Sequence, residues 1–139
     1  MAKGFGRTLS ILVVEDDKAV AELLRAVLNR VPGWGATVVH DAAAAREIIR
    51  HIQVEALVLD VNLPGISGPE LLHMLQDDAA WQGPPVVLAS SDVGQPGVPE
   101  ALRAGRAVAA LQKPFDIDEL VEQIERATSR DVADPAVTG

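Results

Sequence analysis

The sequence contains no cysteine and no tyrosine, and aromatic residues make up only 3% of it. Without cysteine, the chain can form neither a disulfide framework nor a thiolate metal site. Its apolar runs are far shorter than the roughly 20 residues that a membrane-spanning helix needs. Its first residues do not follow the pattern of a secretory signal. We therefore expect a cytoplasmic protein that has no membrane partner.

Positive charge is also scarce, because 12 lysines and arginines face 20 aspartates and glutamates and give a formal net charge of −8. A nucleic-acid-binding surface needs a basic patch that neutralises phosphates. We therefore expect no direct nucleic acid binding by this domain.

Aliphatic residues are abundant, since hydrophobic residues make up 48% of the 139 residues. A chain of this length fits one domain, and an aliphatic core suits parallel strands that helices bury on both faces. The polar ends predict a disordered lead-in at residues 1–8 and a tail or linker at residues 131–139. We expect the domain itself to span residues 9–130.

Short β-branched runs closed by polar residues predict buried strands, and they occupy residues 11–14, 36–39, 56–59, 85–89 and 108–111. Segments with apolar residues at helical spacing follow each run. The first runs from Val20 to Val31 and is capped by Asp17, and the second covers residues 42–52 and is capped by Asp41. The third has Pro69 in its first turn. The fourth is a short helix through Leu102 that follows a loop from Gly94 to Pro99, and the last begins at Asp116. Strands alternating with helices predict an α/β fold, a doubly wound five-stranded parallel sheet with five helices.

Polar residues stand where the predicted strands end. Glu15 and Asp16 follow the first strand, Asp60 the third, Ser90 the fourth and Lys113 the fifth. In an open parallel sheet the carboxyl ends of the strands share one edge, and ligands bind where the strand order reverses. We therefore expect three carboxylates, a hydroxyl and an ammonium group to meet at one place.

Such a group of side chains suits phosphoryl transfer. Carboxylates that lie close together repel one another, and Mg²⁺, which prefers oxygen ligands, relieves that repulsion. A carboxylate such as Asp60 can act as a nucleophile and form an aspartyl phosphate. Positive charge from Mg²⁺ and Lys113, with a hydrogen bond from Ser90, would stabilise the transferred group.

Four motifs carry a resemblance to a known family: ILVVEDD (residues 11–17), LVLDVNLPGISG (57–68), VVLASS (86–91) and QKPF (112–115). Together and in this order they resemble the receiver domain of response regulators in two-component signalling, the fold of the chemotaxis protein CheY. The resemblance covers about residues 10–128. It implies a CheY- and flavodoxin-like sheet with the strand order 2-1-3-4-5.

The resemblance also implies a role for each site residue. Asp60 is the phosphoacceptor and a Mg²⁺ ligand. Asp16 is a direct Mg²⁺ ligand, Glu15 acts on the ion through water, and the backbone carbonyl of Asn62 completes the metal site. Lys113 pairs with the phosphoryl group.

Further roles concern the switch and the lifetime of the phosphoryl group. The resemblance implies that Ser90 is the switch hydroxyl, with Ser91 as its competitor. The Asn62 side chain and Asp92 lie at positions that influence hydrolysis of the aspartyl phosphate in this family. The peptide bond between Lys113 and Pro114 is expected to be cis.

The chain departs from the family in its fifth strand. Many members carry an aromatic residue three positions before the lysine, where this chain has Ala110. The stretch from Gly105 to Lys113 is one residue longer than is typical, and Arg106 stands where a small residue is usual. These departures put the output mechanism in doubt and leave the phosphorylation chemistry intact.

The resemblance implies a histidine kinase or a histidine phosphotransfer protein as donor and a downstream protein that the sequence does not identify. The chain would catalyse only its own phosphorylation and dephosphorylation, and would not be an enzyme for other substrates. One alternative is a phosphorylation-independent pseudo-receiver, which the missing aromatic motivates. Another is a haloacid-dehalogenase-like phosphohydrolase, but Asn62 stands where those enzymes place a second aspartate.

Overall fold

The computed structural model describes residues 8–128. Apart from Thr8, the expected lead-in at residues 1–8 and the expected tail at residues 131–139 lie outside the described residues. The strands are β1 (Leu9–Val14), β2 (Trp34–Val39), β3 (Ala56–Asp60), β4 (Val86–Ser90) and β5 (Ala109–Gln112). The helices are α1 (Lys18–Leu28), α2 (Ala42–Ile48), α3 (Gly68–Asp77), α4 (Val98–Arg103) and α5 (Ile117–Thr128).

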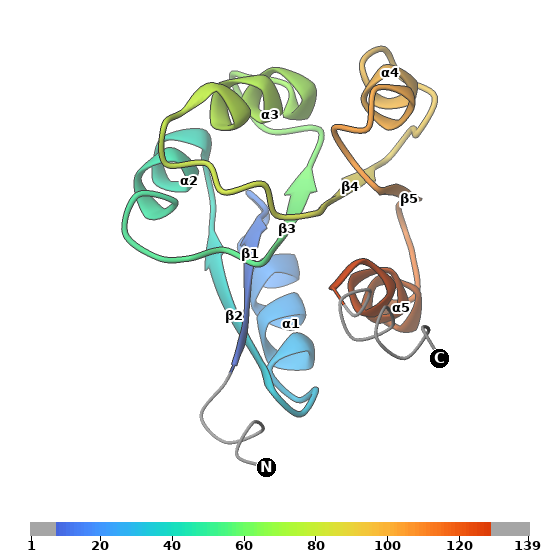
Figure 1. Ribbon diagram of the computed structural model, residues 1–139. Coiled ribbons are helices and arrows are strands. Elements are labelled where there is room, and N and C mark those ends of the chain that lie inside the picture. Colours follow the sequence, from blue (N-terminus) through green and yellow to red (C-terminus); the bar gives the residue numbers. More distant parts are fainter. Residues whose placement is uncertain (1–7, 129–139) are drawn as a thin grey trace, which may run out of the picture.

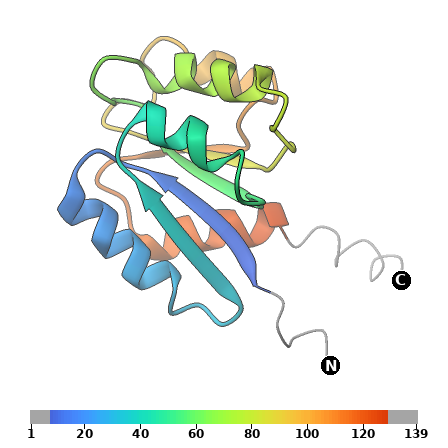
Figure 2. The same cartoon turned by 90° about the vertical axis from the view of Figure 1, so that its left-hand side faces the viewer.

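The strands form one parallel sheet in the order β2-β1-β3-β4-β5, which confirms the predicted fold. Helices α1 and α5 cover one face of this sheet, and α2, α3 and α4 cover the other (Figures 1 and 2). The sheet is thus a middle layer that is buried on both sides. Within residues 8–128, no helix is long and apolar enough to cross a membrane.

The core consists of two clusters, one on each face of the sheet. Along β1, Ile11 and Val13 belong to one cluster, whereas Leu12 and Val14 belong to the other, as the alternation of side chains along a strand requires. The first cluster holds Leu24 and Leu28 of α1 and Leu120 and Ile124 of α5. The second holds Ala45 of α2, Leu71, Leu72 and Leu75 of α3, and Val98 and Ala101 of α4.

The starts of α1, α2 and α3 are set by side chains that accept hydrogen bonds from free backbone N–H groups. Asp17 caps α1 and Asp41 caps α2, both as predicted. Ser67 caps α3 and forms a capping box with Glu70, while Pro69 occupies the first turn. Each cap supplies acceptors that the first turn of a helix lacks.

Some predicted boundaries were wrong. The helix expected over residues 42–52 ends at Ile48, because the chain continues in a turn in which His51 N donates to Ile48 O. Pro99 was expected in a loop but lies in the first turn of α4, where proline needs no N–H partner. The second strand begins two residues earlier than predicted, at Trp34.

The apolar stripe of α1 is also narrower than predicted. Leu24 and Leu28 are buried in the core, but Val20 and Leu23 are exposed to solvent, Leu23 to 56% of its surface. Both exposed residues lie on the flank of α1 that faces the segment after β5, where they line a shallow groove with Phe115.

Adjacent leucines of α1 provide a test of this core. Leu24→Ala should lower the free energy of unfolding by about 2–5 kcal/mol, because it leaves a cavity under the sheet. Leu23→Ala, the matched control, should change it by no more than about 0.5 kcal/mol, as is usual for exposed positions. Urea denaturation measures both values, and equal losses would contradict the assigned packing of α1.

Candidate functional site

Three carboxylates converge at the carboxyl ends of β1 and β3, the two neighbouring strands at which the strand order reverses. Glu15 and Asp16 follow β1, and Asp60 is the last residue of β3. Each contributes a carboxylate oxygen, and these oxygens lie within 4.8 Å of one another. Glu15 and Asp60 are almost completely buried, whereas Asp16 is exposed. Solvent therefore reaches the cluster at Asp16.

Lys113 supplies the positive charge at this site. Its Nζ lies 3.0 Å from Glu15 Oε1 and 3.4 Å from Asp60 Oδ2. The backbone holds it there, because Lys113 N donates to Ser90 O at the end of β4. The peptide bond between Lys113 and Pro114 is cis.

Backbone donors fix the two buried carboxylates. Asn62 N donates to Asp60 Oδ1 at 2.9 Å, and Asp17 N donates to Glu15 Oε2 at 3.1 Å. Each carboxylate therefore has one oxygen bound to the backbone and the other beside Lys113. Nδ1 of His40 also forms a hydrogen bond with the backbone oxygen of Glu15, at 3.0 Å.

Burial and charge shift two pKa values at the site. Burial raises the pKa of Glu15, and the nearby charge of Asp60 adds to this, although hydrogen bonds from Asp17 N and Lys113 oppose it. Burial alone would lower the pKa of Lys113, but its contacts with Glu15 and Asp60 outweigh burial and raise it. The lysine thus stays charged, and the cluster is short of positive charge.

Ser90 lies next to this cluster on β4. Asp60 pairs with Ala89 in the sheet, so Ser90 is one residue further along the neighbouring strand. Its side chain is completely buried, and its Oγ lies 2.8 Å from Asp92 O and 2.9 Å from Gln95 Oε1, both acceptors. Its hydroxyl oxygen also accepts a hydrogen bond from Asp92 N.

Comparison with known proteins identifies this arrangement. The family described as "Response regulator receiver domain" matches residues 11–125. The chain belongs to this family.

Two curated relatives of this receiver domain are regulators with longer chains. The DNA-binding response regulator MtrA of Mycolicibacterium smegmatis is 32% identical over 126 residues, which are 91% of this chain and 53% of that protein. The transcriptional regulatory protein FixJ of Bradyrhizobium diazoefficiens is 35% identical over 127 residues, with 91% and 58% covered. The chain therefore spans a little over half the length of these curated relatives.

A solved structure shows the same fold. The receiver domain of the Francisella response regulator 1452 has a TM-score of 0.78 and 27% sequence identity, and the match covers 89% of this chain and 99% of that one.

Sequence reasoning missed two glutamines around the loop between β4 and α4 of this receiver domain. Gln95 Oε1 accepts hydrogen bonds from Ser90 Oγ and, at 3.2 Å, from Asn62 Nδ2. Gln112, the last residue of β5, accepts from Val93 N at 3.1 Å and donates to the backbone oxygen of Ser91. The segment was interpreted from its glycines and prolines alone, and only the folded chain brings these amides together.

The residues expected to modulate the site have other contacts as well. The Asp92 carboxylate accepts a hydrogen bond from Gly94 N at 2.9 Å. Ser91 Oγ donates to Asn62 Oδ1 at 3.3 Å. The Asn62 side chain therefore bridges Ser91 and Gln95 at the mouth of the site.

The positions that depart from the family lie on and before β5. Ala110 is partly buried on the face of the sheet that α2, α3 and α4 cover. Its methyl group cannot rotate between positions as an aromatic ring can. Arg106 lies in the α4–β5 connection and exchanges hydrogen bonds with Gln76 of α3, at 3.2 and 3.3 Å.

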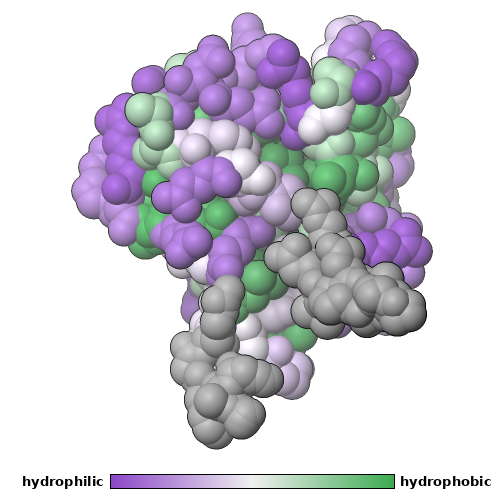
Figure 3. Space-filling model, in the orientation of Figure 1, coloured by the Kyte–Doolittle hydropathy of each residue, from purple (hydrophilic) through white to green (hydrophobic). Residues whose placement is uncertain are grey.

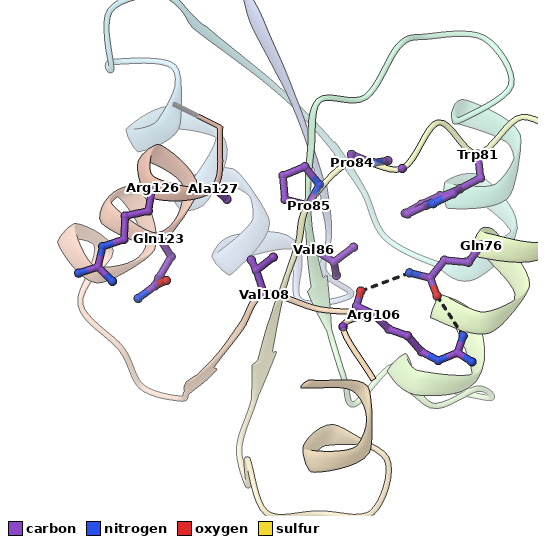
Figure 4. Close-up of a pocket in the computed structure, with 12 residues that line it drawn as sticks. Gln76, Trp81, Pro84, Pro85, Val86, Arg106, Val108, Gln123, Arg126 and Ala127 are labelled. Carbon is purple, nitrogen blue, oxygen red and sulfur yellow. Dashed lines mark hydrogen bonds between the residues drawn. The ribbon is translucent and has the colours of Figure 1, made fainter. Parts of the chain in front are cut away.

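Arg106 also lines a separate pocket of about 570 Å³ (Figure 4). This pocket lies at the amino ends of the strands, whereas Asp60 lies at a carboxyl end. Two of its residues, Val86 and Val108, stand at the start of β4 and just before β5. None of the acidic residues or Lys113 lines it. Hydrophobic surface is visible between α4 and α5 (Figure 3). Val108, which lines the pocket, is 53% exposed.

Replacing Lys113 tests the charge balance of the site. Lys113→Met leaves two buried carboxylates without their cation and should cost about 1–3 kcal/mol of unfolding free energy at neutral pH. This is less than the roughly 3–5 kcal/mol of a fully buried pair, because Lys113 is partly exposed. Arg30→Met, an exposed cation after α1, is the control and should have little effect.

The stability lost in Lys113→Met should depend on pH, and the pKa of Glu15 determines the direction of that dependence. The pKa of Glu15 is already raised in the folded state, and loss of Lys113 should raise it further. An acid whose pKa is higher in the folded state than in the unfolded state destabilises the fold at high pH. This destabilisation sets in as the pH rises past the pKa of the unfolded state and is complete above the pKa of the folded state. The deficit of Lys113→Met should therefore shrink as the pH falls below neutrality, and a deficit that grows on acidification would contradict this account.

Proposed function

We propose that this chain is a phosphoacceptor receiver domain that takes a phosphoryl group onto Asp60 from a histidine kinase or a histidine phosphotransfer protein and then switches partner binding. One observation carries the proposal: Asp60 Oδ2 lies 3.4 Å from Lys113 Nζ inside a cluster of three carboxylates. The pseudo-receiver alternative is favoured by Ala110 alone, whereas every charged group that the reaction needs is present.

The residues fit a Mg²⁺ ion as cofactor. Asp16 and Asp60 would bind it directly together with the backbone carbonyl of Asn62, and Glu15 would act through water. The geometry supports this assignment, because one ammonium group, that of Lys113, lies beside three carboxylates whose oxygens are within 4.8 Å of one another. When bound, Mg²⁺ would neutralise charge on the phosphoryl oxygens.

Residues of the chain itself would orient the nucleophile and stabilise the transferred phosphoryl group. The Asn62 N–H fixes the orientation of the Asp60 carboxylate, which attacks the phosphorus atom as the bond to the donor nitrogen breaks. The Lys113 ammonium group would stabilise the charge on the transferred group. The Ser90 hydroxyl would donate a hydrogen bond to one phosphoryl oxygen, and the Asn62 and Asp92 side chains would modulate hydrolysis.

An apolar groove of about 440 Å³ next to Lys113 supports a protein as the phosphoryl donor. Its lining includes Val20 and Leu23 of α1 together with Pro114 and Phe115. Exposed apolar surface of this kind is typical of protein contact sites. The groove shares Lys113 with the phosphorylation site, so a protein bound there would hold its phosphoryl group close to Asp60.

This proposal retains residues 9–130 as the receiver domain and the cytoplasm as its location. The acceptor chemistry is directed at the chain's own Asp60, so we do not propose an enzyme for external substrates. The downstream partner is a protein that the site does not specify.

The phosphoacceptor is tested by covalent labelling. Incubation with acetyl phosphate and Mg²⁺ should add one phosphoryl group to the protein, and Asp60→Asn should abolish this mass increase because an amide is not a nucleophile for phosphorus. Asp77→Asn, an exposed acidic residue at the end of α3, is the control and should be labelled normally. Labelling that survives in Asp60→Asn would exclude Asp60, and an unlabelled parent protein would favour the pseudo-receiver.

The metal site is tested by thermal unfolding. Mg²⁺ at about 100 times its Kd should raise the free energy of unfolding by about 2.7 kcal/mol, since it binds only the folded state. Asp16→Asn should lose most of this gain, and it should not lower stability without Mg²⁺ because it removes one of three repelling charges. An equal gain in the parent protein and in Asp16→Asn would refute the proposed metal ligand, with Asp77→Asn again as the control.

A further inference from the structure

Gln95 contacts both sides of the phosphorylation site. Its Oε1 accepts hydrogen bonds from Ser90 Oγ at 2.9 Å and from Asn62 Nδ2 at 3.2 Å. Ser90 ends β4, and Asn62 follows Asp60 by two residues and binds the Asp60 carboxylate through its own backbone N–H. A single amide oxygen in the β4–α4 loop thus connects two residues adjacent to the phosphoacceptor.

The Ser90 hydroxyl has one proton, so it can donate one full hydrogen bond at a time. Gln95 Oε1 and Asp92 O both lie within reach of that proton. A phosphoryl oxygen on Asp60 would be a third acceptor, and a stronger one because it carries negative charge. Donation to the phosphoryl group therefore requires that the Ser90 proton leave both of these acceptors, Gln95 Oε1 and Asp92 O.

The backbone of Gln95 leads directly into α4. Val98 N, at the start of that helix, donates to Gln95 O at 3.2 Å. The intervening Gly97 has a φ of +97°, and a Cβ there would lie 2.7 Å from a ring carbon of Pro69 in α3. The start of α4 is thus packed closely against the start of α3, and a change at Gln95 would act on that contact.

We propose that Gln95 is a positioning residue that holds the Ser90 hydroxyl and the start of α4 in the unphosphorylated state, and that phosphorylation of Asp60 releases it. This inference rests on the proposed phosphoacceptor role of Asp60. This chain has Ala110 where many family members have an aromatic switch residue, and the released loop performs that role instead. The signal passes from Ser90 through the Gln95 side chain to the loop and α4. Gln112 holds the other side of the loop by its hydrogen bonds to Val93 N and to the backbone oxygen of Ser91.

The experiment measures binding of beryllofluoride with Mg²⁺, a phosphoryl mimic, by calorimetry. Gln95→Leu keeps a side chain of similar size but removes one of the two competing acceptors and leaves Asp92 O in place. It should bind the mimic about two- to tenfold more tightly, the range that one hydrogen bond accounts for. Gln53→Leu, the same change at an exposed glutamine at the opposite end of β3 from Asp60, is the matched control and should bind like the parent protein.

A Ser90→Ala background isolates the hydroxyl. There the Gln95→Leu change should have no further effect, because no proton remains for which Gln95 and the phosphoryl group compete. Unchanged or weaker binding by Gln95→Leu in the parent background, or an equal gain in both backgrounds, would overturn the proposal.

A second measurement needs no variant. The side-chain amide resonance of Gln95 should shift when beryllofluoride and Mg²⁺ are added to the unmodified protein, and a resonance that stays in place while the mimic binds would also overturn the role of Gln95. If the parent protein does not bind the mimic at all, that result contradicts the proposed phosphoacceptor function. The role of Gln95 then fails as well, because it depends on that function.

Discussion

The site depends on one electrostatic constraint, the burial of two carboxylates beside a single ammonium group. Glu15 and Asp60 are each less than 5% exposed, and Lys113 is the cation within reach of both. Neighbouring strands lie about 4.8 Å apart, and β4 separates β3 from β5, so Lys113 must extend past the end of β4 to reach Asp60. A long side chain and a small residue at the end of β4 meet this requirement, and Ser90 is that small residue.

This constraint explains why the sequence could predict that these side chains meet at one end of the sheet. A parallel sheet buried on both faces requires uninterrupted apolar strands, so a charged residue at a strand end is conspicuous in the sequence. Strand direction then brings these ends together without knowledge of any side-chain contact. The positions of Glu15, Asp16, Asp60 and Lys113 therefore followed from the pattern of apolar runs.

The features that the sequence did not predict depend on contacts between distant segments. The spacing of α1 includes Leu23 among the apolar positions, but in the folded chain Leu23 is exposed and lines the groove beside Lys113. The contact of Gln95 with Ser90 and Asn62 depends on how a loop rich in glycine and proline folds back over the sheet edge. Local propensity contains no information about such a contact.

The missing aromatic residue at Ala110 bears directly on how a phosphoryl group could change this protein. A ligand shifts a conformational equilibrium only through contacts that differ between the two states. An aromatic side chain supplies such a difference by moving between a buried and an exposed position, and a methyl group cannot. The Ser90 hydroxyl can supply a contact that differs between the two states, because its single proton cannot be donated to Gln95 and to a phosphoryl oxygen at the same time. The absence of the aromatic therefore does not require an inert domain, and the coupling that we propose runs through polar contacts at the mouth of the site.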